Sequence, residues 1–509
     1  MSNRFYNSTT GDASNQLGLV GRYTVTAAGI AFPFSVSYRQ SGGNFSHPFN
    51  RFTVAPSYKW ASLQVGTTSM YFSPYTLAGV PIQGLGLQLT PGPLSMSMVY
   101  GKMRNFNIIE PQDATEVLIL DSYDRKATGL KIGYVADRVG IELMGLKVKD
   151  SGVSADSLSR PADNLVIGST LSLALIKNLR IKVNAAASGI TNDLETQDLA
   201  LSDQLEGLNS LLEINASSRL NFAGDASLDY NQSKWGLGLR YKRIEPLFES
   251  LGTSFFLTDV SQYKWYGNLN LMKNKLRLSG SFGVEQNNIK NNRLENNTRT
   301  IGSLSVILTA AKNLQFTANY FNYQKNSEPN LIEFSDTLRY TVVTRTGYLS
   351  TRVGIYNTSS ASHNLLLSAN WQRVNDQSPI QNLGTDILNT GYSIRYQYRF
   401  KPLKLNTSIG WRFSSLNLID RTRSRYGLLF NVSKPFLGEK LRTSFSSNYF
   451  FNDIDGKRDG NNFRLMSRLA YAFNKRMQMN FNLIYTSRTL ILSDNRDEWR
   501  GSLGVSQSF

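Results

Sequence analysis

The chain has 509 residues, of which 41% are hydrophobic and only 18% are charged, and its formal net charge is +18. Ordinary soluble domains carry about 25% charged residues, so the polarity of this chain comes mainly from Ser, Thr, Asn, Gln and Tyr. The absence of cysteine excludes disulfides, thiolate metal sites, a cysteine nucleophile and a lipid-modified N-terminal cysteine.

A soluble chain of this length would divide into roughly three domains, but neither linkers nor composition shifts divide this one. We therefore predict a single domain over residues 1–509. No run approaches the roughly 20 apolar residues of a membrane-spanning helix. The N-terminal residues MSNRFYNSTTGDASNQ lack the layout of a signal peptide, so any export signal is expected to have been removed.

Apolar and polar residues alternate along the chain from near its N-terminus. The earliest clear segments are Gln16–Ala27 and Ala31–Arg39, and about 25 such segments lead to Phe509. Each has about 10 residues or slightly more, enough to cross the hydrocarbon layer of a bilayer as a tilted strand. Soluble sandwiches alternate too, but their strands usually have about 5 to 6 residues and their inner faces favour aliphatic side chains.

Here the apolar faces begin and end with aromatic residues, and the opposite faces are rich in Arg, Asn, Ser and Gln. These faces predict an all-β fold, a single transmembrane antiparallel up-and-down β-barrel that is apolar outside and wet inside. Single-chain bacterial barrels normally have an even number of strands. We therefore assign one more strand to about Asn3–Thr9 and predict about 26 strands, with both termini periplasmic.

Three sequence stretches within Pro48–Gly101 resemble those of a known family, namely PFNRFTVAPSYKW, MYFSPYTLAGVPIQGLGLQLTPG and MVYGKM. They resemble stretches near the start of large outer-membrane β-barrel proteins of the Bacteroidota, a group largely without assigned function. The resemblance covers the rest of the chain only as a general pattern. It implies a fold and an outer-membrane location, and it brings no catalytic or binding residues.

Short and long connections between the predicted strands alternate along the chain. Lys177-Asn178 and Lys401-Pro402 are typical short ones, whereas Ile190–Ser217 and Gln286–Asn297 are long and polar. Barrels of the bacterial outer membrane have short periplasmic turns and long extracellular loops, so this pattern predicts the orientation of the chain.

Several of the long connections are unusually apolar for exposed loops. They are Tyr71–Ile82, Asn107–Leu120 and Pro246–Leu257, in the connections near 71–82, 107–120 and 245–260. Apolar surface left in water costs roughly 25 cal/mol per Å², so we expect these loops to fold into the lumen or to dock on a partner. Leucines within Thr196–Ile214 have roughly helical spacing and predict a short acidic helix in the connection near 190–217. The alternative is a loop packed only on itself.

The last third of the chain carries basic residues on the polar faces of its predicted strands. Tyr392–Phe400 and Leu403–Phe413 are two clear examples of this alternation. The predicted basic wall consists of Arg395, Arg399, Lys404, Arg412, Arg423, Arg425, Arg442, Arg464, Arg468, Arg476 and Arg500. A basic lumen favours anions, which makes this wall a candidate anion path. The alternatives are pairing with acidic loops folded inward and neutralisation of lipid phosphates.

The final segment ends the chain on an aromatic residue. Ser502, Gly504 and Phe509 match the C-terminal signal by which outer-membrane barrels are recognised for assembly, whereas Gln507 stands where a second aromatic is usual. This similarity predicts that the segment is an assembly signal.

Enzymatic, metal-binding and nucleic-acid functions have little support, and we expect no enzyme activity and no cofactor. His47 and His363 stand next to no evident nucleophile. The stretch DIDGKRDGNN at 453–462 is only weakly similar to the sequence pattern of a calcium-binding loop. An Asp-Gly turn at the tip of a hairpin is the simpler interpretation. The basic residues alternate along strands instead of forming a patch with stacking aromatics, so no nucleic-acid partner is expected.

Two classes of function remain. One is a wide outer-membrane channel for polar or anionic solutes, occluded by inserted loops. The other is a plugged scaffold barrel in a multiprotein machine for secretion, assembly or nutrient uptake. A lipopolysaccharide-inserting barrel ranks third, because the periplasmic domain of such proteins is missing from this sequence. The expected partners are outer-membrane lipids including lipopolysaccharide, the barrel assembly machinery, and other outer-membrane or surface lipoprotein subunits.

Overall fold

The computed structural model describes residues 2–8, 14–27, 29–39, 51–103, 123–151, 160–197, 211–253, 257–330, 339–378, 386–474, 477–491 and 495–507. These residues form 27 β-strands in one sheet. None of them belongs to a helix long and apolar enough to span a membrane.

The strands follow one another along the chain with connections of varying length. The first fourteen are β1 (Ser2–Ser8), β2 (Ser14–Ala27), β3 (Ile30–Arg39), β4 (Arg51–Val54), β5 (Ser57–Tyr58), β6 (Ala61–Thr68), β7 (Ile82–Leu89), β8 (Leu94–Met103), β9 (Asp124–Val135), β10 (Val139–Ser151), β11 (Asp163–Ile176), β12 (Leu179–Thr191), β13 (Ser218–Asn231) and β14 (Trp235–Ile244). The others are β15 (Val260–Leu271), β16 (Leu276–Gln286), β17 (Glu295–Ala311), β18 (Leu314–Pro329), β19 (Tyr340–Asn357), β20 (Ala361–Asp376), β21 (Ile387–Phe400), β22 (Leu405–Asn417), β23 (Thr422–Phe436), β24 (Leu441–Ile454), β25 (Lys457–Ala472), β26 (Met477–Leu490) and β27 (Arg496–Gln507).

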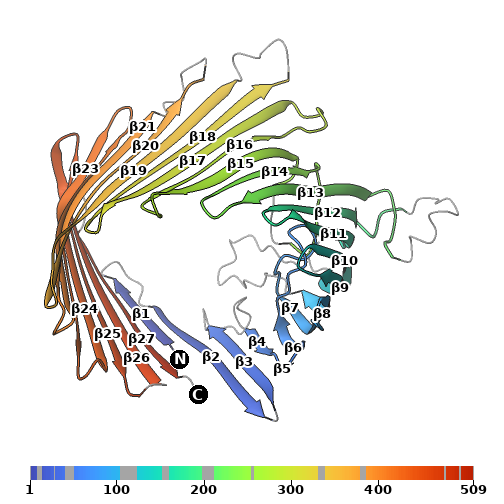
Figure 1. The fold of residues 1–509 in the computed structure, drawn as a ribbon, viewed down its shortest axis with the longest axis horizontal. Helices are drawn as coiled ribbons and strands as arrows, with labels where there is room; N and C mark the ends of the chain where they lie inside the picture. Colours follow the sequence, from blue (N-terminus) through green and yellow to red (C-terminus); the bar gives the residue numbers. More distant parts are fainter. Residues whose placement is uncertain are drawn as a thin grey trace, which may run out of the picture.

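The sheet closes on itself as an antiparallel ring (Figure 1). β1 pairs with β2 on one side and with β27 on the other, where Ser2 lies opposite Gly504. β4 and β5 both lie between β3 and β6, so the 27 strands fill 26 positions around the ring. This confirms the predicted up-and-down barrel of about 26 strands, including the extra N-terminal strand. Among the described residues, each strand pairs with a neighbour on both sides, as closure of a barrel requires.

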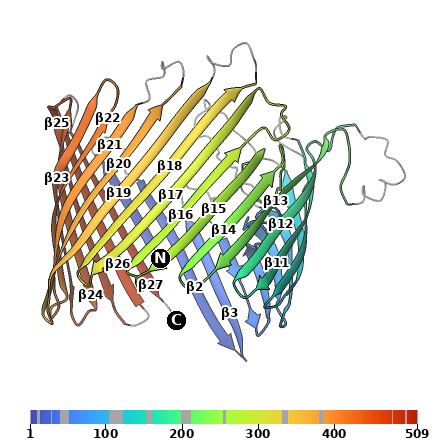
Figure 2. The ribbon, with the colours of Figure 1, turned by 45° about the horizontal axis from the view of Figure 1, so that its top comes forward.

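The two ends of the barrel differ in the length of their connections. At one end, turns of two to four residues join successive strands, and at the other end most connections are longer. Ser2 lies opposite Gly504, and Gln507 lies opposite Met477, which follows a short turn. Both chain ends therefore lie at the short-turn end (Figure 2).

The hairpin between β24 and β25 lies at the long-loop end and has a connection of two residues, 455–456, which is shorter than the others there. Its turn residues Asp455 and Gly456 both have positive φ, at 49° and 76°. A two-residue hairpin loop with positive φ at both positions is the type I′ turn that Asp-Gly sequences favour. The stretch at 453–462 is thus a hairpin tip, as its sequence predicts.

The inner and outer faces of the wall can be assigned from β10. Ile141 and Leu143 are exposed, whereas Met144, Leu146 and Val148 are buried beneath the connections that lie inside the ring. The buried set therefore faces inward and the exposed set outward. Because side chains alternate along a strand, the same assignment follows round the whole ring through the strand register.

Aromatic pairs recur on the outer face. The rings of Trp411 and Phe413 stack with centroids 6.3 Å apart, and those of Tyr485 and Trp499 lie 4.4 Å apart. His363 belongs to the same kind of group near the short-turn end, with its ring 4.9 Å from that of Tyr398. Such rings suit the boundary between hydrocarbon and water, so we interpret His363 as part of an aromatic belt.

The register of β26 and β27 predicts the outcome of cysteine labelling. Phe481 lies opposite Leu503 on the outer face, whereas Asn482 donates a hydrogen bond to Ser502 on the inner face, with 3.1 Å between Nδ2 and Oγ. Cysteines at Phe481 and Leu483 are therefore expected to react with a membrane-restricted spin label, and cysteines at Asn480 and Asn482 with a water-soluble reagent. The reverse result would place the strand one residue out of register.

Candidate functional site

The inner wall of β8 to β14 carries a buried apolar patch, next to polar and charged residues such as Asp225 and Arg240. Its buried members include Val99, Met103, Met144, Leu146, Val148, Val166, Ala186, Ala223 and Ile244. Sequence reasoning assigned the apolar face of each strand to the outside and missed this second apolar face. The signal was present in β10, where apolar residues occupy both alternating faces.

The connection between β6 and β7, residues 69–81, covers part of this apolar wall; we call it the first inner segment. Phe72, Tyr75 and Leu77 are almost completely buried in it. The segment turns back on itself through a hydrogen bond from the Phe72 amide to the Leu77 carbonyl, 2.8 Å long. The Thr76 hydroxyl donates to the sulfur of Met144 on β10 at 3.3 Å. The segment is thus anchored to the inner wall.

The described residues of the connection between β14 and β15, 245–253 and 257–259, pack beside it; we call them the second inner segment. Phe248 is 2% exposed and meets Tyr75 edge to face, with ring centroids 6.4 Å apart. The Ala78 amide donates to the Gly252 carbonyl at 3.0 Å, and the Ser250 hydroxyl donates to the Thr76 carbonyl at 2.6 Å. The two segments therefore form one unit.

Gly252 is needed for this close approach. A Cβ atom at this position would lie 2.5 Å from the Thr76 carbonyl oxygen and would clash with a methyl of Leu146. Any larger residue would push the second inner segment away from the first segment and from the wall.

A buried polar network holds Tyr75 to the wall. Its hydroxyl donates to the Asp225 carboxylate at 2.8 Å, and that carboxylate also pairs with Arg240 at 3.0 Å and accepts from Asn184 at 3.3 Å. Burial, and then the neighbouring negative charge of Asp225, raise the pKa of the Tyr75 hydroxyl. Tyr75 therefore stays protonated and keeps donating to Asp225 at physiological pH.

The four connections singled out from the sequence have different outcomes. Residues of the connections near 71–82 and 245–260 pack inside the ring, although Tyr71 and Leu247 remain exposed. Asn107–Leu120 lies outside the described residues, as do residues 198–210 and 254–256. The predicted helix within Thr196–Ile214 is absent from the described ends of that stretch, 196–197 and 211–214. These ends bind the rim instead, where Lys149 forms an ion pair with Glu213.

Most of the predicted basic wall lies on the inner face of β21 to β25. Tyr392 and Ile394 point outward from β21, so Arg395 and Arg399 point inward, and the register carries this assignment to the neighbouring strands. The arginines placed in this way are Arg395, Arg399, Arg412, Arg423, Arg425, Arg442, Arg464 and Arg468. Within the described part of the chain, none of these eight forms an ion pair with a carboxylate.

Three members of the predicted wall differ from the others. β22 begins at Leu405 and not at Leu403, so Lys404 lies in the turn before the strand, with a φ of 51°. Its side chain forms an ion pair with Glu439. Arg500 is on the inner face of β27 and pairs with Glu498. Arg476 lies outside the described residues. The interpretation of Lys404 as a strand residue was therefore wrong, and the charges of Lys404 and Arg500 are locally balanced.

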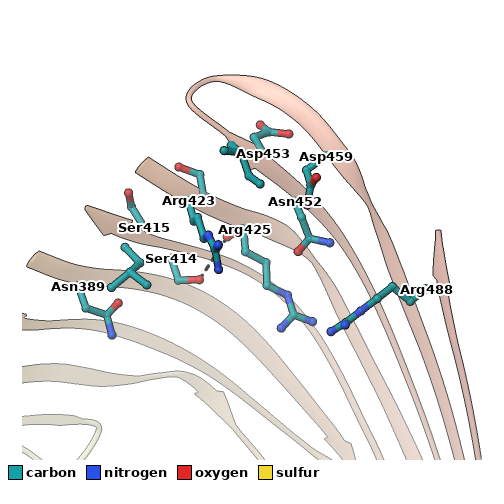
Figure 3. A pocket seen from close by; sticks show the side chains of 12 residues that line it. Asn389, Ser414, Ser415, Arg423, Arg425, Asn452, Asp453, Asp459 and Arg488 are labelled. Carbon is teal, nitrogen blue, oxygen red and sulfur yellow. Dashed lines mark hydrogen bonds between the residues drawn. The ribbon is translucent and has the colours of Figure 1, made fainter. Parts of the chain in front are cut away.

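A pocket of about 400 Å³ lies at the long-loop end of this basic wall. Arg423 and Arg425 of β23 and Arg488 of β26 line it, with Ser414, Ser415, Asn389 and Asn452 around them (Figure 3). The basic wall predicted from the sequence did not include Arg488, although Arg488 lies two residues after Thr486 on the same polar face of β26. The Arg425 guanidinium lies 4.1 Å from the centroid of the Phe450 ring, which fixes its position.

A second pocket of about 450 Å³ lies at the short-turn end of the same wall. Arg442 and Arg468 line it, together with the Lys404–Glu439 pair and the amides of Asn480 and Asn482. Arg464, on β25 between the two pockets, lies opposite Asn448 and Thr486. Positive charge thus extends along the inner wall from one end of the barrel to the other.

The predicted assembly signal lies in β27 and just beyond it. Ser502 accepts the hydrogen bond from Asn482, and Gly504 lies between Asn480 of β26 and Ser2 of β1. Phe509 lies outside the described residues. The last strand therefore joins the two ends of the chain and closes the ring.

No group of three or more histidine and acidic side chains able to hold a metal ion occurs in the described ranges. The acidic groups there are mostly engaged with arginine or lysine at the rim and on the wall. Examples are Asp150 with Arg125 at 2.7 Å and Asp259 with Arg293 at 2.6 Å.

Comparison with known proteins gives only distant likenesses. No protein-family model matches the chain, and no curated protein matches it. Among solved structures, the P pilus usher PapC translocation pore has 10% identity and a TM-score of 0.44, covering 99% of this chain and 98% of its own. OccAB2 of Acinetobacter baumannii has 11% identity and a TM-score of 0.33, covering 77% of this chain and 99% of its own. OmpT, an outer membrane protein of Vibrio cholerae, in its loop L8 deletion mutant, has 10% identity and a TM-score of 0.26, covering 74% of this chain and 99% of its own.

Proposed function

We propose that this chain is an integral outer-membrane channel for anionic solutes, with both termini and the short turns in the periplasm. The observation that carries the proposal is the row of inner-face arginines on β21 to β25, which form no ion pair with any carboxylate in the described part of the chain. Fixed charge in a lumen walled by low-dielectric material attracts counter-ions and sets the sign of the permeant ion. A ring of 26 positions encloses a lumen wider than its own side chains fill, so solute has room to pass.

The location in the outer membrane is supported by the outer face. Exposed apolar side chains such as Leu143, Ile167 and Leu237 form a surface that suits hydrocarbon and not water. Outer-membrane lipids, lipopolysaccharide among them, would then be the partners of this face. The resemblance of the Pro48–Gly101 stretches to Bacteroidota barrel proteins is consistent with the same location.

The two inner segments are proposed to occlude part of the lumen. Their apolar residues pack on one side of the ring, against β8 to β14, and the arginines stand on the strands that follow. Solute would therefore pass along the basic wall, with the inner segments narrowing the route from the opposite side. The proposal includes no catalytic residue, no cofactor and no nucleic-acid partner.

A second candidate function is a plugged scaffold barrel that works within a larger envelope complex. The observation that favours it is the extent of the contact between the inner segments and the wall, which includes both a buried apolar core and the Tyr75–Asp225 network. Such a barrel would bind other outer-membrane or surface lipoprotein subunits through its long-loop end.

Conductance of the purified chain in a planar bilayer separates these two functions. An anion channel is expected to give a current whose reversal potential in a salt gradient has the sign of anion flow. A sealed scaffold barrel is expected to conduct almost nothing alone. A cation-selective current would contradict both proposals.

Removal of the terminal aromatic is expected to reduce assembly. Phe509→Ala should lower the amount of protein inserted in the outer membrane several-fold, because the insertion machinery is expected to read the terminal aromatic before the ring closes. The measurement is the heat-modifiable folded fraction in isolated outer membranes, with Gln507→Ala as the matched control. Unchanged insertion of Phe509→Ala would remove the evidence for an assembly signal here.

A further inference from the structure

Three arginines lie in one hydrogen-bonded register row on the inner face near the long-loop end. The row crosses six neighbouring strands, β22 to β27, in the order Arg412, Gly427, Phe450, Asn462, Arg488 and Arg496. Arg488 and Arg496 lie directly opposite each other, and opposite residues in an antiparallel pair have Cβ atoms about 4.5 to 5.5 Å apart. Like charges in this position repel each other, so the arrangement costs stability unless an anion binds there.

Arg425 adds a fourth charge above this row. Its guanidinium rests on the Phe450 ring, and the positive charges of Arg412 and Arg488 both repel it. Figure 3 shows the guanidinium ends of Arg425 and Arg488 pointing toward each other across the pocket. Gly427 lies between Arg412 and Phe450 in the row, and a Cβ atom there would clash with the Tyr449 carbonyl, so only glycine fits this close approach of β23 to β24.

The carboxylates of this pocket do not neutralise the cluster. Asp453 and Asp459 lie toward the hairpin tip between β24 and β25, away from the guanidinium ends of Arg425 and Arg488 (Figure 3). Asp453 pairs with Arg458 at 3.4 Å. Among the described residues, Arg412, Arg423, Arg425, Arg488 and Arg496 have no ion pair.

We propose that this pocket is a specific binding site for a solute carrying a diphosphate or a dianionic phosphate group. Arg423, Arg425 and Arg488 line the pocket, and Arg412 and Arg496 flank it at the two ends of the register row; we name these five residues the arginine cluster. A guanidinium presents paired N–H donors that match two phosphate oxygens, and several of them together stabilise more than one negative charge. The hydroxyl of Ser414 and the amides of Asn389 and Asn452 add neutral donors around the same space.

The size of the pocket is consistent with this ligand class. Its volume of about 400 Å³ lies in the range of small-molecule sites, and it is far larger than a chloride ion requires. This inference rests on the proposed function, since it names the anion that the basic wall selects. It also makes a separate claim, because binding at the cluster does not require that the barrel conduct.

The test is titration calorimetry of the full chain in detergent with sodium pyrophosphate at low salt. Arg425→Gln with Arg488→Gln is expected to weaken binding roughly tenfold or more, because each lost guanidinium removes charge-assisted hydrogen bonds. The matched control is Arg442→Gln with Arg468→Gln, which removes the same charge from the pocket at the short-turn end. This control is expected to change the affinity by less than about twofold.

A conservative variant separates a built site from diffuse charge. Arg425→Lys with Arg488→Lys keeps both charges and loses the paired donors, so it is expected to weaken binding nearly as much as the glutamine variant. Equal weakening by the cluster and control variants, or full affinity in the lysine variant, would overturn the site. Absence of pyrophosphate binding to the wild type would overturn it as well. Anion-selective current without pyrophosphate binding would remove this inference alone, and binding without any current would remove the proposed channel alone.

Discussion

Replacing Arg395, Arg399, Arg412 and Arg464 with glutamate is expected to reverse the ion selectivity of the barrel from anions to cations. All four side chains lie on the inner face and form no ion pair with a described carboxylate, so the change replaces four positive charges on the inner wall with four negative ones. The sign of fixed charge along a lumen decides which ions concentrate there. We expect the anion-to-cation permeability ratio to fall by roughly tenfold or more, measured from the reversal potential in a salt gradient.

Two controls define this result. The fourfold glutamine variant is expected to lie between the wild type and the glutamate variant, because it removes charge without reversing it. Arg458→Glu changes a charge that stacks on Phe451 and Tyr426 of the outer face and is expected to leave selectivity unchanged. A glutamate variant that keeps the anion preference of the wild type would show that ions do not pass along this wall.

Replacing Leu77 and Phe248 with alanine is expected to loosen both inner segments and to raise the conductance several-fold. Leu77 is 0% exposed and Phe248 is 2% exposed, and both belong to the buried cluster that joins the segments to β8–β14. Truncation of a buried Leu or Phe costs about 2 to 5 kcal/mol, and this loss falls on the contact between the segments and the wall. The ring itself keeps all its strand pairs, so the barrel is expected to remain folded.

The residue next to Phe248 supplies a matched control. Leu247 is 61% exposed, so Leu247→Ala is expected to change neither conductance nor protease resistance of the inner segments. The measurement combines single-channel recording with limited proteolysis, which reports release of the segments independently of any current. If the segments become cleavable and the current stays at the wild-type level, the inner segments do not limit the route. The scaffold function would then be the better interpretation of the apolar contact.

The sequence by itself was sufficient for the barrel. Period-two alternation over segments of about 10 residues decides which side chains share a face, and a shift of one residue would turn every apolar side chain inward. The even strand number and the short and long connections gave 26 positions and the grouping of both termini at one end, which the register of β1 with β27 confirms. The inward position of Arg395, Arg399 and Arg412 followed from the same alternation.

Only the tertiary structure decided what stands inside the ring and which residues meet there. Alternation assigns faces and says nothing of contacts between connections far apart in sequence, such as Tyr75 with Asp225, or Ala78 with Gly252. The second apolar face of β10 has a partner only because the first and second inner segments cover it. Arg412, Arg488 and Arg496 come from three strands, and only the register of the closed sheet places them in one row. Local pattern is a property of each strand, whereas a charge cluster across strands depends on the pairing of all the strands between them.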